Sequence, residues 1–123
     1  MKNNNQLTSN VGLYYVCYEL SKRGWNVMIT ARNARGVDIV MYSQDANKMK
    51  TIQVKSSTES ILPTVRIEYP IADYLIIITK VYRRDRDIYI CNKDKIKDEI
   101  EKGLIQRSSY KHFKNNWKSI GNG

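Results

Sequence analysis

An aspartate, a glutamine and a lysine draw attention by their types and their spacing. Asp38 lies in a short run of β-forming residues, and Gln53 and Lys55 lie two positions apart in a run that alternates polar with apolar residues. Side chains on a strand alternate between its two faces, so Gln53 and Lys55 are expected on the same face. The polar stretch 43–48 has the composition of a turn, which predicts that the two runs pair as antiparallel strands. An acid, an amide and an amine then converge at one edge of this pair.

These residue types suit metal-assisted hydrolysis of a phosphodiester. Such a reaction needs a hard divalent cation, Mg²⁺ or Mn²⁺, which neutralises charge on the phosphate and prefers oxygen ligands. Asp38 supplies a carboxylate, Gln53 an amide oxygen and Val54 a backbone carbonyl. The Lys55 amine is suited to hold the attacking water or to stabilise the pentacovalent charge. A solvent-exposed glutamine and lysine on an ordinary hairpin are the simpler explanation of the same pattern.

Composition limits the classes of protein that need to be considered. The 123 residues correspond to a single domain, 1–123, and a hydrophobic fraction of 41% with 27% charged residues is typical of globular proteins. The net charge of +9 predicts a polyanionic partner, with DNA favoured over RNA, although a basic surface that only aids solubility is the alternative. No apolar run has the ~18 residues of a membrane span, and the N-terminal ten residues lack the apolar core of a signal peptide. We therefore expect a cytoplasmic protein that does not engage membranes.

A helix is expected before the two strands. Residues 1–7 have the composition of a flexible polar leader, a helix is predicted for 11–23, and Gly24 ends it. The candidate caps are Thr8, Ser9 and Asn10. The residues expected on its buried face are Val11, Tyr14, Tyr15 and Tyr18, with Cys17 beside them.

The remaining elements complete a mixed α/β arrangement. Residues 74–79 form the most continuously apolar run, which predicts a central strand covered on both faces. The other expected elements are a mostly buried strand at 25–30, an edge strand at 65–69, a hairpin partner at 88–91, a helix at 93–102 capped by Asn92 with Ile96 and Ile100 on one face and Gly103 as terminator, and a basic C-terminal helix or tail at 108–123. This order predicts a mixed central β-sheet flanked by helices.

Three segments resemble a known family. They are ELSKRGWNV at 19–27, NARGVDI at 33–39 and IQVK at 52–55. Together they resemble the PD-(D/E)xK nuclease superfamily, which has the restriction-endonuclease-like fold, and in particular small bacterial and phage members with QVK in place of ExK. The resemblance covers about residues 9–92. It implies a Mg²⁺-dependent endonuclease in which Asp38 binds the metal ion, Gln53 completes the metal site and Lys55 assists catalysis, and it implies a homodimer that cuts both DNA strands.

The sequence departs from the family pattern at two places. Gln53 replaces an acid, which removes one negative charge and predicts weaker metal binding. Relatives often carry a glutamate near the start of the first helix, where this chain has Leu13, and Glu19 is the remaining acid on that helix. Glu19 is therefore a candidate additional acid, with an ordinary surface role as the alternative. A catalytically weak or inactive member that binds DNA, or a protein partner as an inhibitor or accessory, stays an open alternative.

Several polar and basic residues are candidates for nucleic-acid contacts. Two arginines lie in the loop before Asp38, two serines follow Lys55, and three lysines alternate with aromatic residues in the tail. Arginine is suited to clamping phosphates through paired hydrogen bonds, and ordinary surface charge is the alternative for the arginines and lysines. The candidates are Arg32, Arg35, Ser56, Ser57, Lys111, Lys114 and Lys118.

Overall fold

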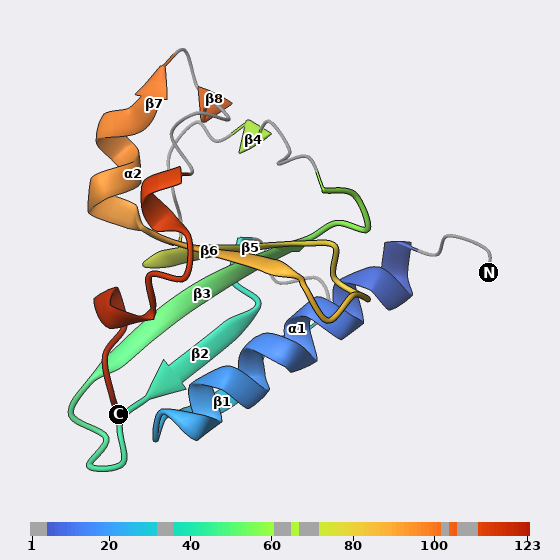
Figure 1. Ribbon diagram of the computed structural model, residues 1–123. Coiled ribbons are helices and arrows are strands. Elements are labelled where there is room, and N and C mark those ends of the chain that lie inside the picture. The colour runs from blue at the N-terminus through green and yellow to red at the C-terminus, as the bar shows by residue number, and fades with distance from the viewer. Residues whose placement is uncertain (1–4, 32–35, 61–64, 67–71, 102–103, 106–110) are drawn as a thin grey trace.

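The computed structural model describes residues 5–31, 36–60, 65–66, 72–101, 104–105 and 111–123 (Figure 1). Its elements follow the expected order of one helix, a series of strands, a second helix and a tail, except that two short strands, which the sequence did not predict, lie between the second helix and the tail. They are α1 (Asn5–Lys22), β1 (Asn26–Ile29), β2 (Ile39–Tyr42), β3 (Met49–Ser56), β4 (Val65–Arg66), β5 (Tyr74–Thr79), β6 (Asp87–Asn92), α2 (Lys93–Glu99), β7 (Ile100–Glu101), β8 (Leu104–Ile105) and the 3₁₀ turn η2 (Trp117–Ser119). The predicted α/β class with a mixed central sheet is confirmed. No helix in these ranges is long and apolar enough to cross a membrane.

The main sheet has five strands in the order β1-β2-β3-β5-β6. Strands β3 and β5 are parallel, and the other neighbours are antiparallel. Ile39 of β2 lies opposite Ile52 of β3, which confirms the predicted antiparallel hairpin. The segment between β3 and β5 contributes β4 to a second, three-stranded sheet with the order β4-β8-β7.

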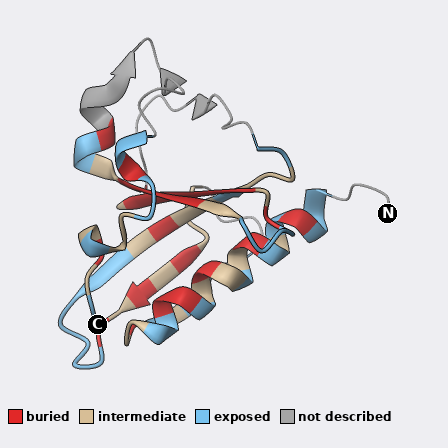
Figure 2. Cartoon of the chain, viewed as in Figure 1, coloured by how far each residue is buried: buried red, intermediate tan, exposed pale blue. Residues whose placement is uncertain are grey.

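Strand β5 lies at the centre of the core, as its continuous apolar sequence predicts. All six of its residues are buried, and Figure 2 shows the burial extending along the neighbouring strand β6. Alternate side chains enter two separate clusters, because neighbouring positions on a strand face opposite sides. One cluster joins α1 to the sheet through Val16, Leu20, Ile39, Ile52, Ile76, Ile78 and Ile90. The other joins α2 and the tail to the opposite face through Leu75, Ile77, Tyr89, Cys91, Ile96 and Phe113.

Helix α1 buries only part of the predicted face, because Tyr15 and Cys17 pack against the core whereas Val11, Tyr14 and Tyr18 are exposed. Residues 5–7 belong to the helix, so the proposed caps Thr8, Ser9 and Asn10 lie inside it, and residues 1–4 lie outside the described residues. Tyr14 and Tyr18 are each 60% exposed. The buried residues are Thr8, Gly12, Val16, Glu19 and Leu20. The physical reason is Gly12, since a Cβ at this position would lie 1.7 Å from Ser56 Oγ, so the missing side chain lets α1 approach β3 closely.

Two further elements differ from their predictions. Strand β1 is an edge strand that is largely exposed, whereas the sequence predicted a mostly buried strand. Helix α2 ends at Glu99, and Ile100 begins β7 and so does not share a helical face with Ile96. The predicted terminator Gly103 lies outside the described residues. The predicted cap is confirmed, because Asn92 Oδ1 accepts a hydrogen bond from the Asp94 N–H at 2.9 Å.

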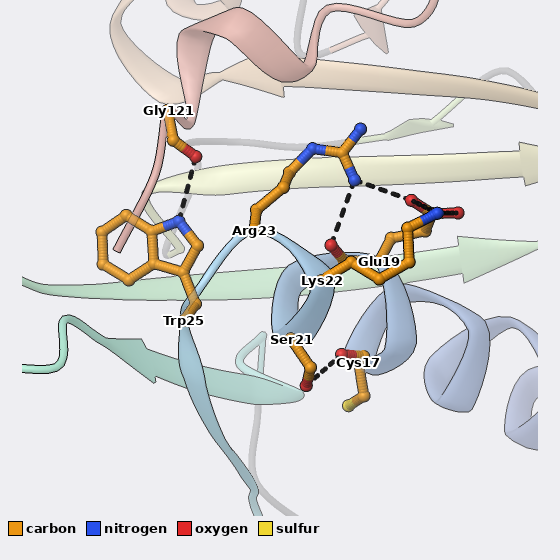
Figure 3. A network of polar contacts seen from close by, with 7 residues as sticks. All are labelled: Cys17, Glu19, Ser21, Lys22, Arg23, Trp25 and Gly121. Carbon is orange, nitrogen blue, oxygen red and sulfur yellow. Dashed lines mark hydrogen bonds and ion pairs between the residues drawn. The ribbon is translucent and has the colours of Figure 1, made fainter.

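The C-terminal tail docks on the sheet but is not one amphipathic helix. Residues 111–113 and 117–119 form separate 3₁₀ turns, and Asn115 between them has a φ of 53°, which a right-handed helix does not allow. The predicted positions 108–110 lie outside the described residues. Near its end the tail is fixed to the loop after α1, where Trp25 Nε1 donates to the Gly121 carbonyl at 3.1 Å (Figure 3).

Candidate functional site

Asp38 lies just before β2, between the end of β1 and strand β3. Its Oδ2 accepts a hydrogen bond from the Val54 N–H at 2.7 Å, and its own N–H donates to the Ile52 carbonyl at 2.8 Å. Its carbonyl accepts the Thr30 N–H at 3.0 Å. The residue lies one position before β2, so its carboxylate accepts an N–H of β3 just beyond the end of β2. These bonds fix both the backbone and the side chain of Asp38.

The three residues singled out by the sequence line one cavity of about 570 Å³. Asp38 borders it from the start of β2, and Gln53 and Lys55 border it from β3. The rest of its wall comes from α1, from residues 29–31 at the end of β1, and from neighbours of Asp38, Gln53 and Lys55 in the chain. Those residues are Gln6, Ser9, Asn10, Leu13, Tyr14, Ile29, Thr30, Ala31, Gly36, Val54 and Ser56.

The donor atoms around this cavity suit a hard cation. The backbone N–H and C=O of one strand residue point toward the same neighbouring strand, so the Val54 carbonyl is directed to the edge where its N–H meets Asp38. Together with the Asp38 carboxylate and the amide oxygen of Gln53, it makes a set of possible metal ligands that are all oxygens, the type preferred by Mg²⁺ and Mn²⁺. Among the described residues no group of three or more His, Cys, Asp or Glu side chains could hold a metal ion. The cavity residues therefore offer such an ion a single carboxylate, that of Asp38.

Lys55 supplies the positive charge among the cavity residues. Its side chain is exposed, and it forms no ion pair with any residue in the described part of the chain. Gln53 is half-buried on the same strand. An ammonium group that is not neutralised by a neighbouring carboxylate is available to a phosphate oxygen or to a water molecule.

Glu19, the candidate additional acid, lies away from the cavity, and a role for it in the site stays a prediction. It does not line the cavity; its Oε2 lies 2.6 Å from Arg23 Nη1 and 3.4 Å from Lys22 Nζ (Figure 3). Burial alone raises the pKa of Glu19, but hydrogen bonds from Arg23 and Tyr15 and the nearby positive charges hold that pKa below its ordinary value. Glu19 is therefore an ionised partner of Arg23 that fixes the end of α1.

The two serines after Lys55 differ in the surroundings of their hydroxyls. Ser56 Oγ is buried next to Gly12 and has no hydrogen-bond partner among the described residues. Ser57 Oγ accepts the Glu59 N–H at 3.0 Å. Their expected contacts with nucleic acid stay predictions.

The basic candidates are spread over the chain. The tail lysines Lys111, Lys114 and Lys118 are exposed, and Lys114 Nζ lies 3.3 Å from Asp87 Oδ1. None of the three lines the cavity. Arg32 and Arg35 lie outside the described residues. Phosphate binding by these five residues stays a prediction.

The part of the cavity wall that α1 contributes was not expected from the sequence. Gln6, Ser9, Asn10 and Tyr14 line the cavity from the first half of the helix. From the sequence, these positions are expected in a leader, at helix caps and on a buried face. Their spacing of three and four residues is the signal that could have placed them on one side of a helix that begins earlier.

Comparison with known proteins shows the fold. No family model and no curated protein matches this chain. Among solved structures, a bacterial homing endonuclease matches with a TM-score of 0.63 and 15% sequence identity, over 96% of this chain and 93% of that one. The chain therefore has a fold that a nuclease also uses.

Proposed function

We propose that this chain is a metal-dependent endonuclease-like domain of the PD-(D/E)xK kind that hydrolyses DNA phosphodiester bonds. The observation that carries the proposal is the Asp38 carboxylate, fixed by the Val54 N–H and lining one cavity with Gln53 and Lys55. The fold shared with a homing endonuclease and the net charge of +9 support it.

Each residue has a distinct role in this proposal. Asp38, Gln53 and the Val54 carbonyl would hold the Mg²⁺ or Mn²⁺ ion, which when bound neutralises phosphate charge and lowers the pKa of a water. One carboxylate oxygen of Asp38 accepts the Val54 N–H, which leaves the other oxygen for the ion. Lys55 positions the attacking water or stabilises the charge that develops on the phosphate.

The test is a cleavage assay on single-stranded, duplex and branched DNA with Mg²⁺ or Mn²⁺. The variants are Asp38→Asn and Lys55→Met, with Lys50→Met as a matched control because Lys50 is an exposed lysine of the same strand that does not line the cavity. We expect both site variants to lose roughly a hundredfold or more in rate, the size of effect that a lost electrostatic stabiliser has. Metal-dependent cutting that is equal in all four proteins would contradict the proposal.

A second candidate function follows from the single carboxylate in the cavity. A domain with so few charged ligands is suited to binding DNA, or a protein partner, without cutting DNA. Binding of this kind predicts salt-sensitive DNA affinity that survives Asp38→Asn and needs no metal ion. Both candidate functions are compatible with a homodimer, and the mass of the purified chain in analytical sedimentation tests whether it dimerises.

A further inference from the structure

The outer face of α1 carries a row of large side chains that are exposed. Leu7, Val11, Tyr14 and Tyr18 are 53%, 37%, 60% and 60% exposed. Their spacing of four, three and four residues places them on one side of the helix. Two of the four are aromatic rings, with one helical turn between them.

This row is continuous with the proposed site. Tyr14 belongs both to the row and to the wall of the cavity that Asp38 and Lys55 line. Tyr18 lies four residues further along, about 6 Å by the helical rise. Lys22 follows at the same spacing, with its Nζ 5.0 Å from the centre of the Tyr18 ring. A nucleic-acid strand that leaves the cavity over Tyr14 would therefore meet the Tyr18 ring and then the positive charge of Lys22.

The electrostatics of this face suit a polyanion. Residues 5–18 contain no acidic side chain. The next residue, Glu19, is buried and is neutralised by Arg23 and Lys22. Lys55 adds positive charge at the cavity, and at the other end of the row Lys22 and Arg23 together exceed the negative charge of Glu19. A nucleic-acid strand would meet no repulsion from α1 along this path.

Resting on the proposed function, we propose that Tyr14 and Tyr18 stack on the bases of an unpaired DNA strand whose phosphate lies in the Asp38 cavity. Exposed rings bind bases irrespective of sequence, because every base has a π-face. Bases inside a duplex already stack on their neighbours, whereas unpaired bases offer their faces to the protein. The substrate class is therefore single-stranded or locally unpaired DNA.

The test measures binding without cleavage, in EDTA, by fluorescence anisotropy of a labelled single strand and of a hairpin duplex with the same bases. The variants are Tyr14→Ala, Tyr18→Ala and the corresponding phenylalanines, with Val11→Ala as a control on the same helix face. We expect each alanine to weaken single-strand binding by roughly ten- to hundredfold, the range seen for lost stacking rings. Phenylalanine and the Val11 control should retain the affinity. An aminopurine base in the strand should be quenched by wild type and less so by Tyr14→Ala.

Two results would overturn this proposal. One is equal affinity of the tyrosine-to-alanine variants and wild type for the single strand. The other is a loss in Val11→Ala as large as in the tyrosine variants, together with a concentration-dependent mass in sedimentation, which would mark the row as a contact between copies of the chain. The anisotropy measurement needs neither metal nor cleavage. The stacking proposal can therefore fail while the nuclease proposal holds, and stacking can be found even if the protein does not cleave DNA.

Discussion

Asp38 and Val54 are joined by a hydrogen bond of 2.7 Å between the Asp38 carboxylate and the Val54 N–H. The carboxylate that the sequence marks as a metal ligand therefore also completes the hydrogen bonding between β2 and β3. Its own N–H bonds to the Ile52 carbonyl, so the residue is tied to β3 at two points. A variant that only removes the carboxylate would disturb the site and the sheet together, and Asp38→Asn is the substitution that separates the two effects.

Asp38→Ala should lower the free energy of unfolding, because the Val54 N–H loses its acceptor at a half-buried position. The expected loss is about 1–3 kcal/mol, the cost of a polar group left without a partner. Asp38→Asn keeps an oxygen acceptor and should lose less. Urea denaturation of the three proteins measures the difference. Equal stability of wild type and Asp38→Ala would show that this hydrogen bond does not hold the strands.

Gly12→Ala should destabilise the fold, although alanine favours helices over glycine by about 1 kcal/mol. The added Cβ would lie 1.7 Å from Ser56 Oγ and 2.9 Å from Ser56 Cβ, so α1 and β3 must move apart. Overpacking of this kind costs about 1–3 kcal/mol or more. The double variant Gly12→Ala with Ser56→Gly should recover most of the loss. No recovery in thermal unfolding would mean that the contact between these two residues does not set the helix position.

Glu19→Gln should remove part of the acid sensitivity of the protein. The pKa of Glu19 is lowered in the folded state, so its contribution to stability is present above its unfolded pKa of about 4.3 and is lost as pH falls through the lower folded pKa. At pH 7 the variant should lose about 1–3 kcal/mol, since hydrogen bonds to charged groups are among the stronger ones. As pH falls below about 4.3 the two melting temperatures should approach each other, and they should coincide below the folded pKa of Glu19. Exposed Glu59 offers a control, and a Glu59→Gln curve that converges in the same way would contradict the assignment.

Cys91 should be inert in the folded protein. Burial raises the pKa of its thiol to about 12, so almost no thiolate is present at pH 8. In a Cys17→Ser background, a disulfide reagent should label Cys91 only after urea unfolds the chain. Fast labelling of the native variant would show that this face of the sheet opens readily.

The parts of the fold that depend on local sequence could be predicted. The apolar run of β5 required cover on both faces, and the alternation in β3 placed Gln53 and Lys55 on one side. The orientation of α1 could not be predicted, because it depends on Gly12 fitting against Ser56, a contact between residues far apart in the chain. The break in the tail lies at Asn115, which has a positive φ and donates its N–H to the Ile88 carbonyl of β6, a contact between residues far apart in the chain. Glu19 resembled a site residue in sequence, but its pairing with Arg23 becomes visible only in three dimensions.

The most direct test of the central claim is a calorimetric Mn²⁺ titration of wild type, Asp38→Asn and Gln53→Glu. If Asp38 and Gln53 share one ion, wild type should bind weakly and Asp38→Asn should lose binding. Gln53→Glu should bind on the order of tenfold more tightly, because it adds a second carboxylate to the donor set. Identical titrations for the three proteins would contradict a metal site at Asp38 and Gln53.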